Sequence, residues 1–505
     1  MRKFRLRSIK SFEDSGDIEI KPITIFVGKN SCGKSSILRF PAVLAQTFKE
    51  DVATPLLLFG NMSDYGNFDD VINNHCGEKF GFSLEFGEEI RGQIARRLPV
   101  LTDSETFNAF RKMISNTKSV KVEVQIAKPN RKMLVDEIRL YVDDKSLFEL
   151  IRKEAAYETV FSNIIDEKGK QYKINLSLAK VSFDRFFPIF DADEVVEQFM
   201  KVNNLPEKEK VQDILRNLFY MSIEDRQAVQ KQEWYELLED IYVVNAYLRG
   251  CSYFLKNEAR KMSYIGPFRE NPKRIYRDSE SRYSDVGVRG ENSGMLLRQA
   301  SQGTSGLLAK VSSWFSKAMG YEIDIQDIES SLYSLVVKSH VKNRDGSERD
   351  EIDNLIDVGY GISQVLPIVT ALYDKGNLLD NPYSVNKRMF LLEQPELHLH
   401  PAAQAELADL LVECIIENKS RRILLETHSE HLIRKLQVLI ANPEYDFHND
   451  QVVIYYVDKD EKGYSHVKKM NVLENGQFEE EWPSGFFDKS YELATQLLYS
   501  GLKKN

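Results

Sequence analysis

A glycine-rich segment near the start of the chain combines a lysine with hydroxyl-bearing residues. Residues 28–35 read GKNSCGKS and satisfy the pattern G-x-x-x-x-G-K-[ST]. The apolar run at 23–27 is typical of a strand buried on both faces of a sheet, and a helical stretch follows the loop. Glycines let successive backbone N–H groups curl around an anion, and the helix behind them presents its positive end. The segment therefore predicts a phosphate-binding loop.

The side chains of this loop indicate a nucleoside triphosphate with its metal ion. We expect Lys34 to reach the β- and γ-phosphates and the Ser35 hydroxyl to bind Mg²⁺, so ATP and Mg²⁺ are the predicted cofactors. The other residues that we expect to contact the nucleotide are Gly28, Asn30, Ser31, Cys32, Gly33 and Ser36. Because Pro41 departs from an ideal helix, we expect a kink there.

A second segment with reactive groups follows the apolar run at 389–392. Glu393 stands at the end of this expected strand, and Gln394, Pro395 and Glu396 come directly after it. A carboxylate at the C-terminal edge of such a strand holds the Mg²⁺ shell close to the hydroxyl of the phosphate-binding loop. We therefore expect Glu393 to act on the metal together with Ser35.

Two further segments carry polar groups at expected element ends. Residues 426–431 read ETHSEH and follow the apolar run at 423–425. Residues 357–364 read DVGYGISQ and precede the acidic strand. Small residues and a serine at the start of a helix can clamp a phosphate, although this segment alone also fits a structural turn.

The elements around these segments alternate between strand and helix. Apolar residues fall on one helix face at 407–415, between the strands at 389–392 and 423–425, and again at 432–440. Ser429 is the expected N-cap of the second helix. Strand, helix, strand, helix is the pattern of a mostly parallel sheet covered by helices, so we predict an α/β fold.

The middle of the chain has a different pattern. Alternation between about 80 and 180 predicts a β-rich lobe, and the proline-free stretch 207–266 predicts a helical insertion, serving either as a lid or as an assembly surface. The expected domains are an N-terminal part of an ATPase head (1–75), the β-rich lobe (76–190), the helical arm (191–262), the C-terminal part of the head (263–445) and a C-terminal extension containing a hairpin (446–505).

The composition limits the environment and the partners. A length of 505 residues exceeds one ordinary core, and a net charge of −9 does not attract nucleic acid or anionic lipid, so any nucleic-acid contact must be a local patch. The four cysteines are scattered without a CxxC pair, which favours a reducing cytoplasm. No stretch is long and apolar enough for a membrane span, and we expect no membrane contact.

In their order, the four segments resemble those of ABC-type P-loop ATPase heads. The resemblance implies that His428 contacts the γ-phosphate and that Gly361 and Ser363 belong to a signature that completes the site of a partner head. ABC-type heads carry a glutamate where this chain has Gln394. An amide positions water but cannot accept its proton, so we expect slow hydrolysis, with Glu396 or His428 as the alternative base.

Within these ATPases the chain resembles the OLD and chromosome-maintenance (SMC-like) group. The segments 264–269, 358–367, 393–401 and 482–488 look like a bacterial subfamily with a C-terminal domain of unknown function. Proteins of this kind are similar to the ATPase subunits of Septu, PARIS and related antiphage systems. This resemblance implies a sensor or scaffold that forms a homodimer or higher oligomer and controls a separate nuclease of the HNH or Toprim type.

Three alternatives stay open at this point. The first is a DNA-repair or maintenance ATPase that clamps DNA through a head dimer. The second is a zinc site, because His398 with His400 and His428 with His431 form HxH and HxxH pairs. The third is a Toprim nuclease that uses the DxD at 458–460, although 458–463 also fits a hairpin turn between two strands. We expect the chain not to be a nuclease itself.

Overall fold

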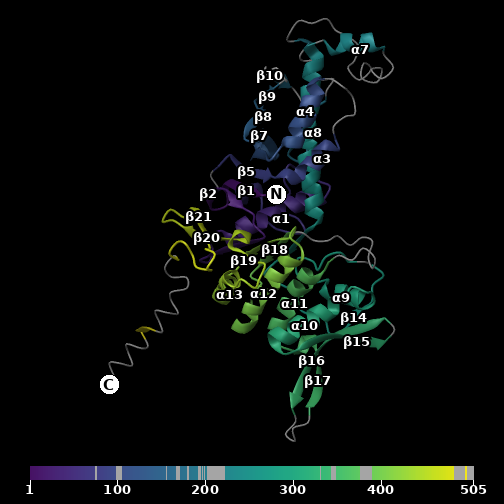
Figure 1. Ribbon diagram of the computed structural model, residues 1–505, viewed down its shortest axis with the longest axis vertical. Coiled ribbons are helices and arrows are strands. Elements are labelled where there is room, and N and C mark those ends of the chain that lie inside the picture. Colours follow the sequence, from purple (N-terminus) through teal and green to yellow (C-terminus); the bar gives the residue numbers. More distant parts are fainter. Residues whose placement is uncertain are drawn as a thin grey trace. The chain divides into compact units, whose positions relative to one another are not determined.

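The computed structural model divides the chain into two units, each with its own sheet (Figure 1). Unit 1 comprises Met1–Ile18 and Val43–Ala259, and unit 2 comprises Glu19–Ala42 and Arg260–Asn505. The structure describes residues 1–73, 77–97, 105–154, 156–165, 171–178, 181–191, 195, 197, 200–201, 222–231, 233–281, 283–329, 331–342, 348–375, 389–482 and 495–496. This grouping differs from the expected domains, because unit 1 combines residues 1–18 and 43–73 with the β-rich lobe and with residues 233–259 of the expected arm.

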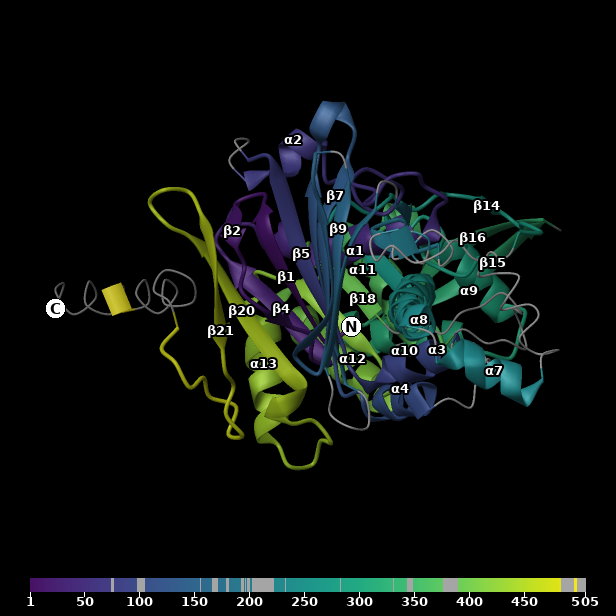
Figure 2. The same cartoon turned by 90° about the horizontal axis from the view of Figure 1, so that it is seen from above.

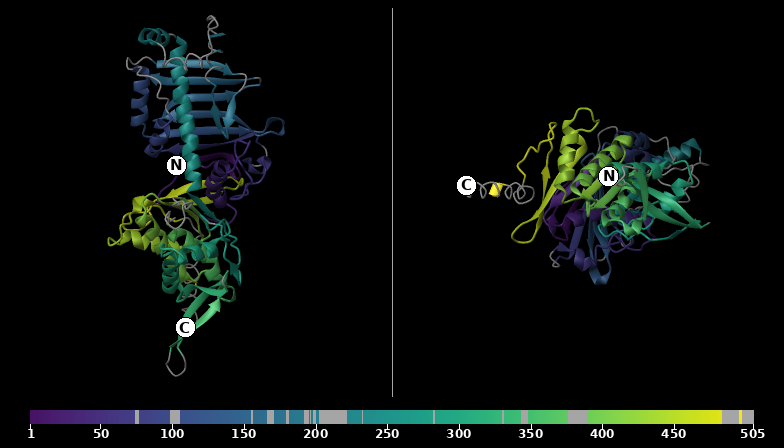
Figure 3. Two further views of the ribbon diagram at one scale, coloured as in Figure 1. Left: turned by 90° about the vertical axis from the view of Figure 1, so that its right-hand side faces the viewer. Right: turned by 90° about the horizontal axis from the view of Figure 1, so that it is seen from below.

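An antiparallel sheet forms the centre of unit 1. Its strand order is β10-β9-β8-β7-β6-β5-β1-β2, and β3 pairs with β1. Figure 3 shows these strands stacked as a ladder. The strands are β1 (Lys3–Ile9), β2 (Phe12–Asp14), β3 (Ile18–Glu19), β5 (Lys79–Phe86), β6 (Val120–Ala127), β7 (Leu134–Val142), β8 (Lys145–Arg152), β9 (Tyr157–Ile165) and β10 (Gln171–Leu178). In β6 the valines are buried and the polar residues between them are half-buried, as the alternation predicts.

Helices and a short hairpin complete the described part of unit 1. The expected helical arm contains a 28-residue helix, α8. The elements are α2 (Phe68–Val71), α3 (Arg91–Ala95), α4 (Glu105–Asn116), β11 (Ser182–Asp184), β12 (Phe187–Ile189), α7 (Ile223–Gln230) and α8 (Glu233–Arg260). No described helix is long and apolar enough to cross a bilayer.

A mostly parallel sheet with the order β13-β18-β19-β4-β20-β21 forms the centre of unit 2. Its strands are β4 (Ile23–Gly28), β13 (Met262–Ile265), β18 (Met389–Glu393), β19 (Arg422–Glu426), β20 (Val452–Lys459) and β21 (Ser465–Met470). All neighbours are parallel except β20 and β21. Every residue of β4 and β18 is buried, which explains their continuous apolar runs. The predicted α/β class is confirmed.

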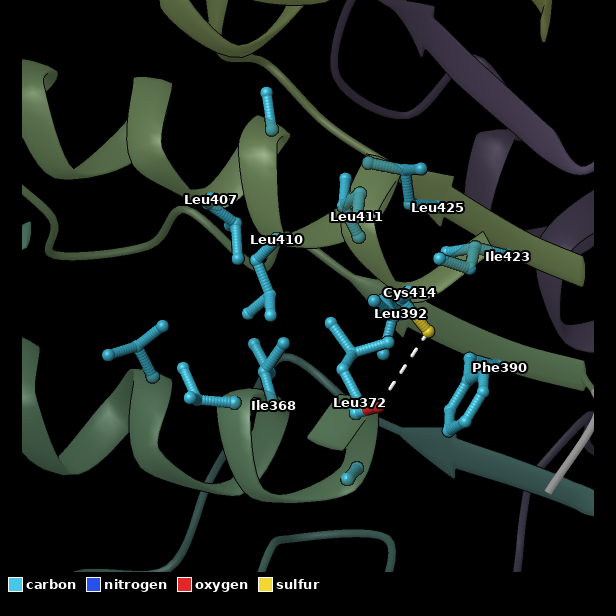
Figure 4. Packing of buried hydrophobic residues seen from close by; sticks show 14 of the residues in the cluster. Ile368, Leu372, Phe390, Leu392, Leu407, Leu410, Leu411, Cys414, Ile423 and Leu425 are labelled. Carbon is cyan, nitrogen blue, oxygen red and sulfur yellow. Dashed lines mark hydrogen bonds between the residues drawn. The ribbon is translucent and has the colours of Figure 1, made fainter. Parts of the chain in front are cut away.

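Helices cover this sheet and bury its core. The helices are α1 (Lys34–Lys49), α9 (Ser293–Ser301), α10 (Leu307–Met319), α11 (Tyr360–Tyr373), α12 (Pro401–Glu417) and α13 (Glu430–Ala441). α1 continues through Pro41 as one helix. In Figure 4, Leu410 of α12 lies beside Ile368 of α11, Leu411 lies beside Leu425 of β19, and Cys414 lies beside Leu392 of β18. Ser429 caps α13 by accepting a hydrogen bond from the Leu432 N–H, as predicted.

Two smaller β elements remain in unit 2. One is a sheet of β14 (Tyr276–Arg277), β16 (Leu332–Lys342), β15 (Glu322–Glu329) and β17 (Glu348–Asn354). The other is the hairpin of β20 and β21, drawn in yellow in Figure 2, whose turn confirms the hairpin predicted at 458–463. Because β20 also pairs in parallel with β4, the hairpin is part of the central sheet rather than an appended extension.

Candidate active site

The phosphate-binding loop joins the end of β4 to the start of α1. Gly28 has φ 144°, and a Cβ atom there would lie 2.0 Å from the carbonyl oxygen of Val457 in β20. Gly33 has φ 102° directly before the helix begins at Lys34. Only glycine tolerates both positions, so the close approach of β20 fixes where the loop turns.

Lys34 and Cys32 point their polar groups into this loop. The Lys34 side chain is buried, and its Nζ donates to the carbonyl oxygens of Gly28 at 3.1 Å and Lys29 at 2.7 Å. The Cys32 thiol donates to the same Lys29 carbonyl, and burial raises its pKa, so it stays a thiol at neutral pH. Ser465 of β21 donates its hydroxyl proton to the Cys32 carbonyl at 2.6 Å. The hairpin therefore braces the loop.

Glu426 is the carboxylate that lies at the loop hydroxyl. The Ser35 Oγ donates to Glu426 Oε2 at 2.6 Å, and Lys34 Nζ lies 3.8 Å from Oε1. Only 4% of Glu426 is exposed, and burial raises its pKa, while the Ser35 hydrogen bond and the Lys34 charge act in the opposite direction. In the sequence Glu426 stands two residues before His428, the residue expected to contact the γ-phosphate. No role was predicted for Glu426 itself.

Glu393, the predicted metal-binding acid, has other partners. Arg39 of α1 holds it through two hydrogen bonds, Nε to Oε1 at 2.6 Å and Nη2 to Oε2 at 2.7 Å. The buried Tyr264 hydroxyl donates to Oε1 at 2.7 Å. The Glu393 hydrogen bond raises the pKa of Arg39 above its ordinary value, so the guanidinium stays charged. The structure thus places Glu393 in an ion pair rather than against Ser35.

Gln394 forms the turn after β18 with φ 43°, a left-handed conformation. Its N–H donates to the Glu426 carbonyl at 2.9 Å. The Arg269 Nη2 donates to the carbonyl oxygens of Glu393 at 2.7 Å and of Gln394 at 3.2 Å. Burial lowers the pKa of Arg269 to about 10. The turn is therefore held on both sides by groups other than the amide side chain, which is half-buried.

Glu396 and His428, the two alternative bases, are joined to each other. Glu396 Oε1 accepts a hydrogen bond from the His428 backbone N–H at 2.7 Å, and burial raises the pKa of the Glu396 carboxyl. Partial burial of the ring, followed by the Lys34 charge, lowers the pKa of His428 to about 4. The imidazole is therefore neutral at pH 7, where it can donate one hydrogen bond and accept another.

The predicted signature segment begins α11. A Cβ atom at Gly361 would lie 2.6 Å from the His398 carbonyl oxygen, so glycine allows the helix to pack on the turn after β18. The Ser363 side chain is buried and donates to the Tyr360 carbonyl at 2.8 Å, within its own helix. The structure therefore brings Gly361 close to the acidic segment of the same chain.

The remaining predicted residues lie around the loop. Asn30 and Ser31 are exposed, and Ser36 is half-buried in the first turn of α1. Of the histidine pairs, His400 caps α12 by accepting from the Ala402 N–H. Within the described ranges no three His, Cys, Asp or Glu side chains form a group that could hold a metal ion.

Four residues of the site were missed from the sequence: Arg39, Tyr264, Arg269 and Glu426. The sequence pattern could have indicated Glu426. It ends β19, and because β19 is parallel to β18, its C-terminal end lies at the same edge of the sheet as Glu393. Tyr264 and Arg269 lie in the segment 264–269, which was singled out only for its resemblance. Arg39 follows Ser35 by one helical turn, a spacing that places both on one face of α1.

The donor set at the loop fits Mg²⁺ with a nucleotide. Mg²⁺ prefers oxygen ligands and is usually held by one or two protein oxygens plus phosphates and water. Ser35 supplies a hydroxyl and Glu426 a carboxylate, with their oxygens 2.6 Å apart. Lys34 Nζ adds a positive charge 3.8 Å from the Glu426 carboxylate. A cage of several protein carboxylates is not needed for such a site.

The chain is similar to two known protein families and to several solved structures. Residues 448–497 match a family described as a protein of unknown function (DUF3696), in agreement with the predicted C-terminal domain of unknown function. A search of curated proteins finds no match. Similar solved structures include an Smc head domain from Pyrococcus furiosus, with 11% identity over 98% of this chain and 98% of that chain and a TM-score of 0.37. An SMC head domain from Thermotoga maritima has 11% identity over 93% of this chain and 99% of that chain, with a TM-score of 0.34. Residues 1–433 match the family described as AAA ATPase domain, and the chain therefore belongs to that family of ATPases.

Proposed function

We propose that the protein binds ATP with Mg²⁺ at residues 28–36, hydrolyses it slowly, and works as a nucleotide-gated switch. The observation that carries the proposal is the turn after β18, where Gln394 stands in place of a carboxylate. A general base contributes roughly 10²–10⁴-fold to a reaction of this kind. Without that base, bound ATP persists long enough to define a structural state.

Each residue around the loop has its own role in this reaction. Lys34 and the loop N–H groups bind the phosphates, and bound Mg²⁺ neutralises part of their charge. The Gln394 amide orients water towards the γ-phosphate, and a neutral His428 donates one hydrogen bond to it. Glu396 is an inefficient base in this arrangement, because one of its oxygens is already bonded to the His428 N–H.

The test is Gln394→Glu in the full chain. We expect turnover to rise by about 10²-fold, because a carboxylate accepts the proton of the attacking water. ATP affinity, measured by calorimetry, should stay nearly unchanged. Lys34→Ala is the control that should remove binding, because the phosphates lose their loop cation. A brisk wild-type turnover that Gln394→Glu does not alter would show that another residue accepts the proton and that the switch proposal fails.

We further propose that two chains form a dimer in which each signature segment completes the partner's site. Two exposed large apolar side chains support an assembly surface: Phe268 is 81% exposed, and Tyr360, the first residue of α11, is 53% exposed. Mixing Lys34→Ala chains with Ser363→Arg chains should restore ATPase activity, because one of the two sites in each heterodimer is then intact. Heterodimers without restored activity would exclude shared sites.

The cellular role that we propose is the sensor or scaffold of an antiphage complex with a separate HNH or Toprim nuclease. Its support is that residues 393–401 and 264–269 resemble a bacterial subfamily whose members are similar to the ATPase subunits of such systems. The pure chain should cut no nucleic acid and should co-purify with a nuclease encoded beside it. DNA-stimulated ATP hydrolysis by the chain alone would instead favour a DNA-maintenance ATPase.

A further inference from the structure

Two carboxylates end neighbouring strands beside the phosphate-binding loop. β18 and β19 are parallel, and Glu393 and Glu426 are register partners at their C-terminal ends. Both side chains are buried, with 2% and 4% of each residue exposed. A divalent cation at the loop can therefore draw on either carboxylate, and their existing partners decide which one is available.

The Glu393 carboxylate is already neutralised. Both of its oxygens accept from the Arg39 guanidinium, and Oε1 also accepts from the Tyr264 hydroxyl. Bidentate guanidinium pairs are among the strongest hydrogen-bonded contacts in proteins. To bind Mg²⁺ directly, Glu393 would have to break this pair and leave Arg39 beside a second cation, which is electrostatically unfavourable.

Glu426 has the opposite surroundings. Its Oε2 accepts the Ser35 hydroxyl proton at 2.6 Å, while its Oε1 lies 3.8 Å from Lys34 Nζ, beyond hydrogen-bond distance. A serine that donates its proton to a carboxylate keeps both oxygen lone pairs for a cation. The contact therefore orients the Ser35 oxygen for metal binding, and the carboxylate next to it is balanced only by Lys34 at 3.8 Å rather than by a hydrogen-bonded guanidinium.

We infer that Glu426, rather than Glu393, is the carboxylate of the Mg²⁺ shell at the phosphate-binding loop, and that Glu393 is a positioning residue that anchors β18 to α1 through Arg39. The inference rests on the proposed binding of ATP with Mg²⁺ and names the residue that makes this binding depend on the metal. It replaces the expectation that Glu393 and Ser35 act on the metal together.

The experiment measures ATP affinity by calorimetry with Mg²⁺ and with EDTA, using the full chain. The wild type should bind ATP more tightly with Mg²⁺. Glu426→Gln should reduce that gain by about 10-fold or more, the cost typical of removing a group around a bound metal. Its affinity for ATP in EDTA should be kept or rise, because a negative charge beside the phosphates is removed.

Two matched variants separate this outcome from a general disturbance. Asp458→Asn changes another carboxylate near the loop, one that lies 3.6 Å from Lys29 Nζ, and should leave the Mg²⁺ gain intact. Glu393→Gln should lower the melting temperature. Its ATP affinity should still increase with Mg²⁺ by nearly as much as that of the wild type. The inference is overturned if Glu393→Gln abolishes the gain and Glu426→Gln does not.

A second readout does not depend on affinity. Mn²⁺ bound with ADP gives an electron paramagnetic resonance spectrum that reports its ligands, and Glu426→Gln should change this spectrum whereas Asp458→Asn should not. If Glu426→Gln fails to fold, Glu426→Asp keeps the charge on a shorter side chain and should give an intermediate Mg²⁺ gain; a wild-type gain and spectrum in that variant would contradict the inference. A wild type that shows no ATP binding would instead refute the proposed function.

Discussion

Two arginine–carboxylate pairs, one in each unit, share a geometry but differ in their surroundings. In unit 1, Arg5 holds Asp14 through two hydrogen bonds of 2.7 and 2.6 Å, and in unit 2, Arg39 holds Glu393 at 2.6 and 2.7 Å. The Asp14 side chain is 39% exposed, whereas that of Glu393 is 2% exposed. Burial, rather than hydrogen-bond length, therefore separates the two pairs.

The two sheets account for this difference. The antiparallel sheet of unit 1 leaves one face accessible, so charged side chains occur in the middle of its strands. The central strands of unit 2 are covered on both faces, so the carboxylates of β18 and β19 lie only at their C-terminal ends. A charge in the first sheet costs little to place. A charged side chain in the sheet of unit 2 requires a partner, so its presence there indicates a structural or functional role.

The largest expected effect on stability is that of Glu393→Ala. Removing the carboxylate leaves the Tyr264 hydroxyl and the Arg39 guanidinium without their shared acceptor. Breaking a fully buried pair costs 3–5 kcal/mol, and because Arg39 is partly solvated we expect a loss of about 2 kcal/mol. Urea unfolding followed by circular dichroism measures it. If Glu393→Ala lowers the free energy of unfolding no more than removal of the Arg5–Asp14 pair does, burial does not explain the difference between the two pairs.

Tyr264→Phe should have a smaller effect, about 1 kcal/mol, because Glu393 keeps both guanidinium bonds and loses one hydroxyl donor. The same urea titration applies. In a double-mutant cycle, Tyr264→Phe should add almost nothing to Glu393→Ala, since the two residues share one interaction. Strictly additive costs would mean that Tyr264 acts through packing alone.

The smallest expected effect is that of Arg5→Met, less than about 1 kcal/mol at pH 7. Burial of Asp14 opposes its ionisation, yet hydrogen bonds from Arg5 and Gly16 lower its pKa below the ordinary value. A carboxyl whose pKa is lowered by folding stabilises the protein above its unfolded pKa, roughly 3.9, and loses that contribution as pH falls through the folded value. The difference between wild type and Arg5→Met should therefore shrink below about pH 4. A difference that grows on acidification would contradict this account.

Much of the fold could be predicted because local patterns determine it. The buried runs at 23–27 and 389–392 and the cap at Ser429 each have a short-range physical cause, and the structure contains all three. The positions of Gly28 and Gly33 follow from the need for positive φ in the loop.

The partners of the acidic residues could not be predicted in the same way. Arg39 and Glu393 are 354 residues apart in the chain, and Ser35 and Glu426 are 391 apart. Each of the two acids ends an apolar strand, so the sequence pattern alone does not tell them apart, and the metal role was expected of Glu393 only. Only the pairing of β18 with β19 and the direction of α1 decide which acid meets the serine and which meets the arginine.

The position of β4 has a consequence for protein synthesis. Ile23 of β4 pairs with Ile423 of β19 and with Val452 of β20. The ribosome must therefore add on the order of 400 further residues before β4 can pair with either neighbour. At ribosomal rates of 5–20 residues per second this delay is roughly 20 to 90 s. During that interval both edges of an apolar strand lack their partners, a state that favours aggregation. The interval ends only after Ser465 has emerged, because its hydroxyl bonds the Cys32 carbonyl of the loop.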